Sequence, residues 1–208
     1  MTGAPKTGSD STQWRRDATN AGSATPAGSA GAKALLRQTL RATRRALDAN
    51  TRAHWDRVIG ARILAWWQGA RAPLLAVYWP LADEPDLAAS YAQLAGWGVQ
   101  LVLPVVLNRD AQLAFAEWVP GEPMAKDVMG IAVPAKLRFA ARVPPAVVIP
   151  CLGFNQGRFR LGYGGGFYDR TLERLPRPIT IGVAYSCLAA QFDSAPHDIA
   201  LDYIFTEA

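Results

Sequence analysis

Short apolar runs with few polar residues recur along this sequence, and they constrain its fold more than any other feature. Each run has the length of a strand rather than of a helix, as expected for strands buried on both faces of a parallel sheet. These runs are Leu74–Trp79, Val99–Val106, Val147–Ile149 and Ile179–Tyr185. The alternating segment Gln112–Val119 predicts a more exposed strand, and Tyr203–Thr206 predicts a short last strand.

Segments with helical periodicity lie between these runs. In Lys33–Asp48, apolar side chains fall on one stripe at Leu36, Leu40 and Leu47, and basic residues lie beside it. The other predicted helices are Arg52–Trp67, Asp86–Ala95 and Phe167–Arg174. Strands that alternate with helices predict a single α/β domain with an open, mostly parallel sheet flanked by helices.

The first part of the chain differs in composition from the rest. Met1–Gly31 is rich in Gly, Ala, Ser, Thr and Pro and has almost no large aliphatic residues. Such a segment buries too little apolar surface to offset its ordering entropy, so we expect residues 1–31 to be a disordered extension and residues 32–208 the folded domain. It also lacks the charged and apolar regions of a secretory signal, and the apolar runs are too short to cross a bilayer.

Composition excludes some classes and leaves others open. Half of the 208 residues are hydrophobic and 19% are charged, as in a soluble folded protein. The only two cysteines, Cys151 and Cys187, have no metal-site spacing, which argues against a disulfide framework or structural zinc and favours a reducing cytoplasm. The net charge of +5 is compatible with a merely soluble basic surface and with attraction of a polyanion, such as a nucleotide, a nucleic acid or a multiply carboxylated substrate, and charge alone does not choose among them.

The most informative stretch is Gly157–Arg170, which reads GRFRLGYGGGFYDR between a predicted strand and a predicted helix. Its glycines allow the backbone to approach a ligand and to turn successive N–H groups toward an anion. Arg160 adds a forked cationic donor, and Asp169 lies in the first turn of the helix, within reach of a cation. The alternative is a tight strand-to-helix turn with a capping acid. The pattern is neither a Walker A loop nor GxGxxG, so it predicts an anion site without naming a reaction.

Arg160–Arg170, RLGYGGGFYDR, closely resembles the signature RLGYGGGYYDR of the 5-formyltetrahydrofolate cyclo-ligase family, also called methenyltetrahydrofolate synthetases. Other segments resemble family motifs in the same order along the chain. They are Lys33 with Arg37, Tyr78–Glu84, Leu103–Val105, Ile181–Tyr185 and Pro196–Asp202. The resemblance covers nearly all of Ala32–Glu207.

The resemblance implies a Rossmann-like, NagB/RpiA-type three-layer fold and an ATP- and magnesium-dependent enzyme. The implied reaction converts 5-formyltetrahydrofolate, free or polyglutamylated, to 5,10-methenyltetrahydrofolate with release of ADP and phosphate. We also expect a cytoplasmic monomer that binds neither nucleic acid nor a membrane.

The resemblance further implies roles for individual residues. Catalytic roles fall to Arg160 and Tyr168, and magnesium binding falls to Asp169 and Asp198. ATP binding falls to Lys33, Arg37, Arg160, Leu161, Gly162, Tyr163, Gly164, Gly165, Gly166, Phe167 and Tyr168. Substrate binding falls to Trp79, Glu84, Tyr163, Gly164, Gly165, Gly166 and Phe167.

Two positions depart from the family pattern, and two other functions stay open. Val133 stands where a glutamate is common, and Asn155 stands where an aspartate is common. The loss of the glutamate is compatible with a non-catalytic folate- or nucleotide-binding paralogue. A nucleic-acid-binding module led by the arginine-rich segment Lys33–Arg62 is the other alternative, although no motif that reads DNA or RNA is present.

Overall fold

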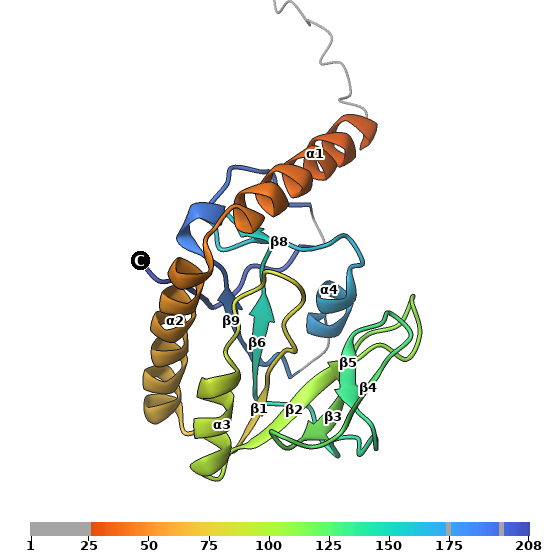
Figure 1. Cartoon of the computed structure of the whole chain (residues 1–208). Coiled ribbons are helices and arrows are strands. Elements are labelled where there is room, and N and C mark those ends of the chain that lie inside the picture. Colours follow the sequence, from red (N-terminus) through yellow and green to blue (C-terminus); the bar gives the residue numbers. More distant parts are fainter. Residues whose placement is uncertain (1–25, 174–175, 196–197) are drawn as a thin grey trace, which may run out of the picture.

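The computed structural model describes residues 26–173, 176–195 and 198–208, and its centre is a six-stranded sheet (Figure 1). The strand order is β10-β9-β6-β1-β2-β3, in which only β3 runs antiparallel to its neighbour. The strands are β1 Leu74–Ala76, β2 Gln100–Val105, β3 Ala114–Trp118, β6 Ala146–Pro150, β9 Ile179–Val183 and β10 Tyr203–Phe205. The open, mostly parallel sheet predicted from the apolar runs is therefore confirmed.

Helices cover both faces of this sheet. They are α1 Pro26–Arg45, α2 Ala49–Ala70, α3 Ala88–Gly96, α4 Phe167–Leu172 and the 3-10 turn η1 Ser186–Leu188. On one face, Ile59 and Ile63 of α2 pack with Leu75 and Val148 of the sheet. On the other face, Leu172 of α4 packs in a second cluster of buried residues. Figure 1 shows α2 and α4 on opposite sides of the strands, which makes three layers.

The successive residues of each central strand alternate between these two clusters. Leu75 belongs to the α2 cluster, while its neighbours Leu74 and Ala76 belong to the α4 cluster. Because both faces are covered, every residue of β1 is buried, and the strand shows no polar alternation.

Four very short strands were not predicted. The hairpin of β4 Met124–Lys126 and β5 Ala132–Pro134 lies beside β2 and β3. A second antiparallel pair, β7 Gly153–Phe154 and β8 Arg160–Leu161, leads from the end of β6 to the glycine-rich loop. These four short segments have neither the continuous apolar run nor the alternation that predicted the strands of the central sheet.

Several predicted boundaries differ from the observed ones. Helix α1 begins at Pro26, before the expected domain start at Ala32, whereas residues 1–25 lie outside the described part of the chain. Strand β1 ends at Ala76 instead of Trp79, and the chain turns only at Ala82–Asp83, where the Tyr78 hydroxyl donates across the turn to the carbonyl of Pro85 at 2.6 Å. Within the described residues, no helix has the length and apolar character needed to span a membrane.

The junction between α1 and α2 determines the direction of α1 relative to the rest of the fold. Asp48 caps α2, since its Oδ1 accepts hydrogen bonds from the N–H groups of Asn50 and Thr51, both at 3.0 Å. Leu40 of α1 is buried in the α2 cluster. This packing leaves other side chains of α1 turned toward the glycine-rich loop.

Candidate functional site

The glycine-rich loop, Gly162–Gly166, follows β8 and ends at the start of α4. Gly164 and Gly166 have φ values of 97° and 65°, in the left-handed region that side chains with a Cβ rarely adopt. Gly166 is also the residue that caps α4. The backbone conformation therefore requires glycine at these two positions, as the sequence predicted for the loop.

Arg160 and Asp169 form an ion pair across the base of the loop. The Nη2 group of Arg160 lies 2.6 Å from Oδ1 of Asp169, and the Arg160 side chain is only 6% exposed. Its guanidinium carbon lies 5.7 Å from the centre of the Tyr168 ring. Within the described residues, the buried Nη1 of Arg160 has no hydrogen-bond partner. A buried N–H without an acceptor is unfavourable, so this atom fits an anionic ligand oxygen.

Two cations of α1, Lys33 and Arg37, reach the same region. The Nε of Arg37 donates to the carbonyl of Gly162 at 2.8 Å, and its guanidinium lies beside Gly164. The Nζ of Lys33 lies 3.2 Å from Oδ2 of Asp198, which also accepts from the backbone N–H of Ala195. The structure thus brings α1, the loop and the segment near the C-terminus together.

Each of the two predicted magnesium ligands is paired with a basic side chain, Asp169 with Arg160 and Asp198 with Lys33. The described part of the chain contains no group of three or more His, Cys, Asp or Glu side chains that could hold a metal by itself. Magnesium in phosphate sites is commonly held by one or two carboxylates together with phosphate oxygens and water. The donor chemistry of Asp169 and Asp198 fits such a site.

Arg44 and Glu84 are buried next to the loop, and Tyr163 of the loop, which is 36% exposed, contacts both of them. The Tyr163 hydroxyl donates to Oε1 of Glu84 and accepts a hydrogen bond from Nη1 of Arg44 at 2.9 Å. The same Nη1 lies 4.0 Å from Oε1 of Glu84. Arg44 and Glu84 are only 4% and 5% exposed. A single tyrosine of the glycine-rich loop therefore contacts the buried carboxylate that was predicted to bind substrate.

The environment of Glu84 has opposing effects on its charge. Burial raises the pKa of the Glu84 carboxyl, and three favourable interactions partly oppose this effect. They are the hydrogen bond from Tyr163, the backbone N–H of Leu81 at 2.8 Å from Oε2, and the nearby Arg44 guanidinium. Burial and the adjacent Glu84 carboxylate also raise the pKa of Tyr163, so its hydroxyl remains a donor.

Sequence reasoning missed the role of Arg44, which it treated only as a flank of the apolar stripe. Arg44 follows Arg37 by seven residues, so both lie on the same side of α1. This spacing was the one sequence signal that could have placed Arg44 on the side of α1 that faces the site. The partner of Arg44 could not be identified, because Tyr163 lies 119 residues away in the sequence.

The predicted aromatic residues lie in different surroundings. Trp79 is 37% exposed and packs edge-on against Trp118 of β3, with ring centres 6.0 Å apart. Tyr168 packs against the α4 cluster, and burial raises its pKa. The Phe167 ring lies under the guanidinium of Arg170 at 5.1 Å.

Arg170 and Thr171 connect α4 to the segment between β2 and β3, which the sequence did not predict. The guanidinium of Arg170 donates to the carbonyls of Gly165, Arg109 and Ala111 at 2.9, 3.2 and 3.3 Å. Thr171 accepts a hydrogen bond from the backbone N–H of Leu113 at 2.9 Å. These bonds attach the glycine-rich loop to a neighbouring loop.

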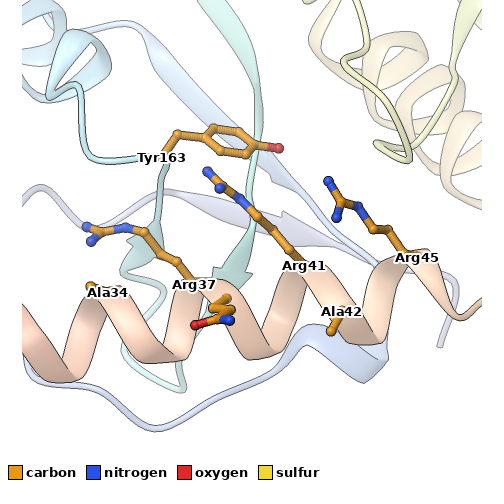
Figure 2. Close-up of a pocket in the computed structure, with 7 residues that line it drawn as sticks. Ala34, Arg37, Arg41, Ala42, Arg45 and Tyr163 are labelled. Atoms are coloured by element: carbon orange, nitrogen blue, oxygen red, sulfur yellow. The ribbon is translucent and has the colours of Figure 1, made fainter.

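A groove of about 510 Å³ runs along the exposed side of α1 next to Tyr163 (Figure 2). Three arginines one helical turn apart line this groove. The lining residues are Ala34, Arg37, Gln38, Arg41, Ala42, Arg45 and Tyr163.

The two departures from the family pattern have local structural explanations. Val133 of β5 is 3% exposed and packs with Val105 and Ala116, so the residue that replaces the expected glutamate is part of an apolar cluster. Asn155 donates through Nδ2 to the carbonyl of Phe192 at 3.1 Å and accepts from the N–H of Phe159 at 3.0 Å. An aspartate could not donate the first of these bonds.

Curated proteins that resemble this chain along most of its length carry the name of one family. A 5-formyltetrahydrofolate cyclo-ligase of Mycoplasma pneumoniae is 27% identical over 180 residues, which cover 84% of this chain and 98% of that protein. The Escherichia coli K12 protein of the same name is 28% identical over 175 residues, which cover 80% and 96%.

Solved structures resemble the whole domain as well. A 5,10-methenyltetrahydrofolate synthetase from Mycoplasma pneumoniae superposes with a TM-score of 0.68 and 27% identity, over 85% of this chain and 99% of that one. The synthetase of Aquifex aeolicus shares the fold, with a TM-score of 0.71 over 84% of this chain and 89% of that one. Since the model of the 5-formyltetrahydrofolate cyclo-ligase family matches residues 29–207, the chain belongs to that family.

Proposed function

We propose that this enzyme converts 5-formyltetrahydrofolate and ATP to 5,10-methenyltetrahydrofolate, ADP and phosphate. One observation carries the proposal: the glycine-rich loop contacts both a group of cations and a buried carboxylate. Gly162 accepts from Arg37, and Tyr163 binds Glu84. A phosphate held by the loop and a pterin held at Glu84 would therefore be neighbours, as phosphoryl transfer between them requires.

ATP supplies the phosphoryl group that converts the formyl oxygen into a leaving group, after which N10 closes the ring and phosphate departs. The task of the protein is to position the reactants and to neutralise charge. Arg160 offers its unpartnered buried Nη1 and, with the N–H groups of Gly162–Gly166, would bind the transferring phosphate. Lys33 and Arg37 would bind the remaining phosphates.

Magnesium would be held by Asp169 and Asp198 together with phosphate oxygens. Both carboxylates are ion-paired with basic side chains, so binding of the metal would exchange one cation for another at each of them. Arg160 and Lys33 would then be released toward the phosphates.

The pterin would bind at Glu84. The amino-pyrimidine ring of a pterin presents adjacent N–H donors, and a carboxylate accepts such a pair. Trp79 would form a wall, and Tyr163, Phe167 and Tyr168 would frame the reacting nitrogen. We further expect a cytoplasmic monomer that accepts free or polyglutamylated substrate.

The test is a spectrophotometric assay of methenyltetrahydrofolate formation from 5-formyltetrahydrofolate and Mg-ATP. We expect product from the unmodified protein and a decrease in kcat of roughly 100-fold for Asp169→Asn, because a carboxylate that would hold magnesium at the phosphates is lost. Asp110→Asn, an exposed carboxylate on the β2–β3 segment, is the matched control and should retain activity.

Folded protein that binds the folate but forms no product would contradict the enzymatic proposal. It would favour a non-catalytic folate-binding protein of the same family. Binding is measured independently by quenching of tryptophan fluorescence, for which the chain has seven tryptophans.

A further inference from the structure

The groove on α1 is lined by charges of one sign. Arg37, Arg41 and Arg45 follow one another at intervals of four residues, and Figure 2 shows their guanidinium groups on the side of the helix where Tyr163 lies. The remaining lining residues, Ala34, Gln38 and Ala42, are small or neutral. Like charges four residues apart on a helix repel one another, so an anion between them would be stabilising.

The carboxylates near this row do not neutralise it. Within the described residues, Asp83 approaches Arg45 at 3.7 Å, but it forms a closer ion pair of 2.6 Å with Arg52. Arg41 has no ion pair in the described part of the chain, and its guanidinium lies 5.2 Å from the centre of the Tyr163 ring. Arg41 and Arg45 therefore remain available for an external anion.

Tyr163 separates this groove from the buried carboxylate. Its hydroxyl binds Glu84, while its ring faces the guanidinium groups of Arg41 and Arg44 at 5.2 and 5.9 Å. The tyrosine is thus a wall shared by the proposed pterin site and the groove. A long ligand that is anchored at Glu84 can reach the groove by passing Tyr163.

We propose that Arg41 and Arg45 bind the glutamate end of the folate, an inference that rests on the proposed function. This end carries two carboxylates a few bonds apart, and arginines four positions apart on a helix are separated by about 6 Å along its axis. The planar guanidinium fork matches a carboxylate. Arg37 is the first arginine of the row. It donates to the carbonyl of Gly162 and so lies beside the loop that would bind phosphate.

The experiment compares two substrates in one double variant, Arg41→Gln with Arg45→Gln. The substrates are 5-formyltetrahydrofolate and 5-formyltetrahydropteroate, which lacks the glutamate. We expect the preference for the glutamate-bearing substrate, as a ratio of kcat/KM values, to fall roughly tenfold in the variant. In the unmodified protein, this preference should weaken as salt is added.

The matched control is Arg57→Gln with Arg62→Gln, which removes the same charge from two exposed positions of α2. This control should keep the substrate preference, which would show that the loss is not a general effect of net charge. The ratio also corrects for any loss of folded protein, because both substrates are measured on the same sample.

Three outcomes would overturn the inference. An unchanged ratio would mean that the row is only a solvated helix face. An increase in the KM for Mg-ATP without a change in the ratio would assign the groove to phosphate. Equal affinity of the unmodified protein for the two folates, measured by tryptophan fluorescence, would show that the glutamate is not recognised.

The same fluorescence measurement separates this inference from the proposed function. If neither substrate is turned over, the proposed reaction fails, but a binding preference for the glutamate-bearing ligand that is lost in the double variant would still support the groove.

Discussion

Glu84 combines burial, which favours the neutral carboxyl, with three interactions that favour the carboxylate. Arg44 contributes the only full positive charge among these three, at 4.0 Å. Its position depends on a hydrogen bond to Tyr163 and on another of 3.2 Å from Nη2 to the carbonyl of Ala82. Arg44 is therefore a positioning residue, which acts on a ligand through Glu84 and Tyr163.

The pH dependence of folate binding tests this role. The folded-state pKa of Glu84 lies above its usual value of 4.5, so Glu84 favours folding below that pH and this contribution is lost as pH rises through the folded-state pKa. Pterin binding needs the carboxylate and should weaken as pH falls through the same pKa. In Arg44→Gln the midpoint of this loss should move upward, because a nearby positive charge that lowers the pKa of Glu84 is removed.

The measurement is folate affinity by tryptophan fluorescence across the acidic range, with Arg44→Lys expected to restore the midpoint in part. Arg62→Gln, an exposed residue of α2, is the charge control. A variant that loses affinity by the same factor at every pH would contradict the electrostatic role and leave Arg44 a purely structural residue.

At the scale of elements, the start of α4 depends on one glycine. Gly166 has a φ of 65°, and a Cβ added there would lie 2.7 Å from Nη1 of Arg170. Gly162, in the same loop, would place a Cβ in open space, and its φ lies outside the left-handed region. The two glycines are therefore not equivalent, although the sequence pattern treats them alike.

We expect Gly166→Ala to reduce the free energy of unfolding by about 1–2 kcal/mol, because a left-handed conformation is unfavourable for alanine. Gly162→Ala should change it by less than about 0.5 kcal/mol. Urea denaturation of both variants gives the comparison. Equal destabilisation of the two variants would show that the left-handed backbone conformation at Gly166 is not the cause.

The β4–β5 hairpin gives a second prediction at this scale. Val133 is buried between Val105 and Ala116, so Val133→Glu places a carboxyl in an apolar cluster. We expect a loss of about 3 kcal/mol at neutral pH. The loss of stability should be smaller at about pH 5, because burial raises the folded-state pKa of the new carboxyl and the neutral form is better tolerated in an apolar cluster.

Val128→Glu is the matched control, since Val128 belongs to the same hairpin region and is exposed. Thermal unfolding of both variants at the two pH values decides the question. If Val133→Glu were as stable as the control, a polar group not yet identified would have to lie within reach of position 133.

For the whole molecule, apolar patterning was sufficient to predict the sheet and most of its helices. The central strands are buried on both faces, so their sequences are continuous apolar runs such as Ala146–Pro150. The short strands beside the glycine-rich loop carry no such signal. They are held by contacts with distant parts of the chain, for example the hydrogen bond of 2.8 Å from the N–H of Ala190 to the carbonyl of Phe154.

The candidate site was predicted where a motif lies within one stretch of sequence, as in Arg160–Asp169. It was missed where a residue becomes important only through distant partners. Arg44 resembles any basic residue on a helix until the fold buries it against Tyr163 and Glu84. Arg170 is similar, since its three carbonyl acceptors come from two separate loops.

The ion pair between Lys33 and Asp198 joins residues that are 165 positions apart. During synthesis, the ribosome releases α1 long before the segment that carries Asp198 has been made. The cations of α1 therefore exist for most of translation without the partners that they have in the finished protein. Because their last partner comes from the end of the chain, a fragment that stops short of residue 198 would hold most of the sheet but lack the completed cluster around Lys33.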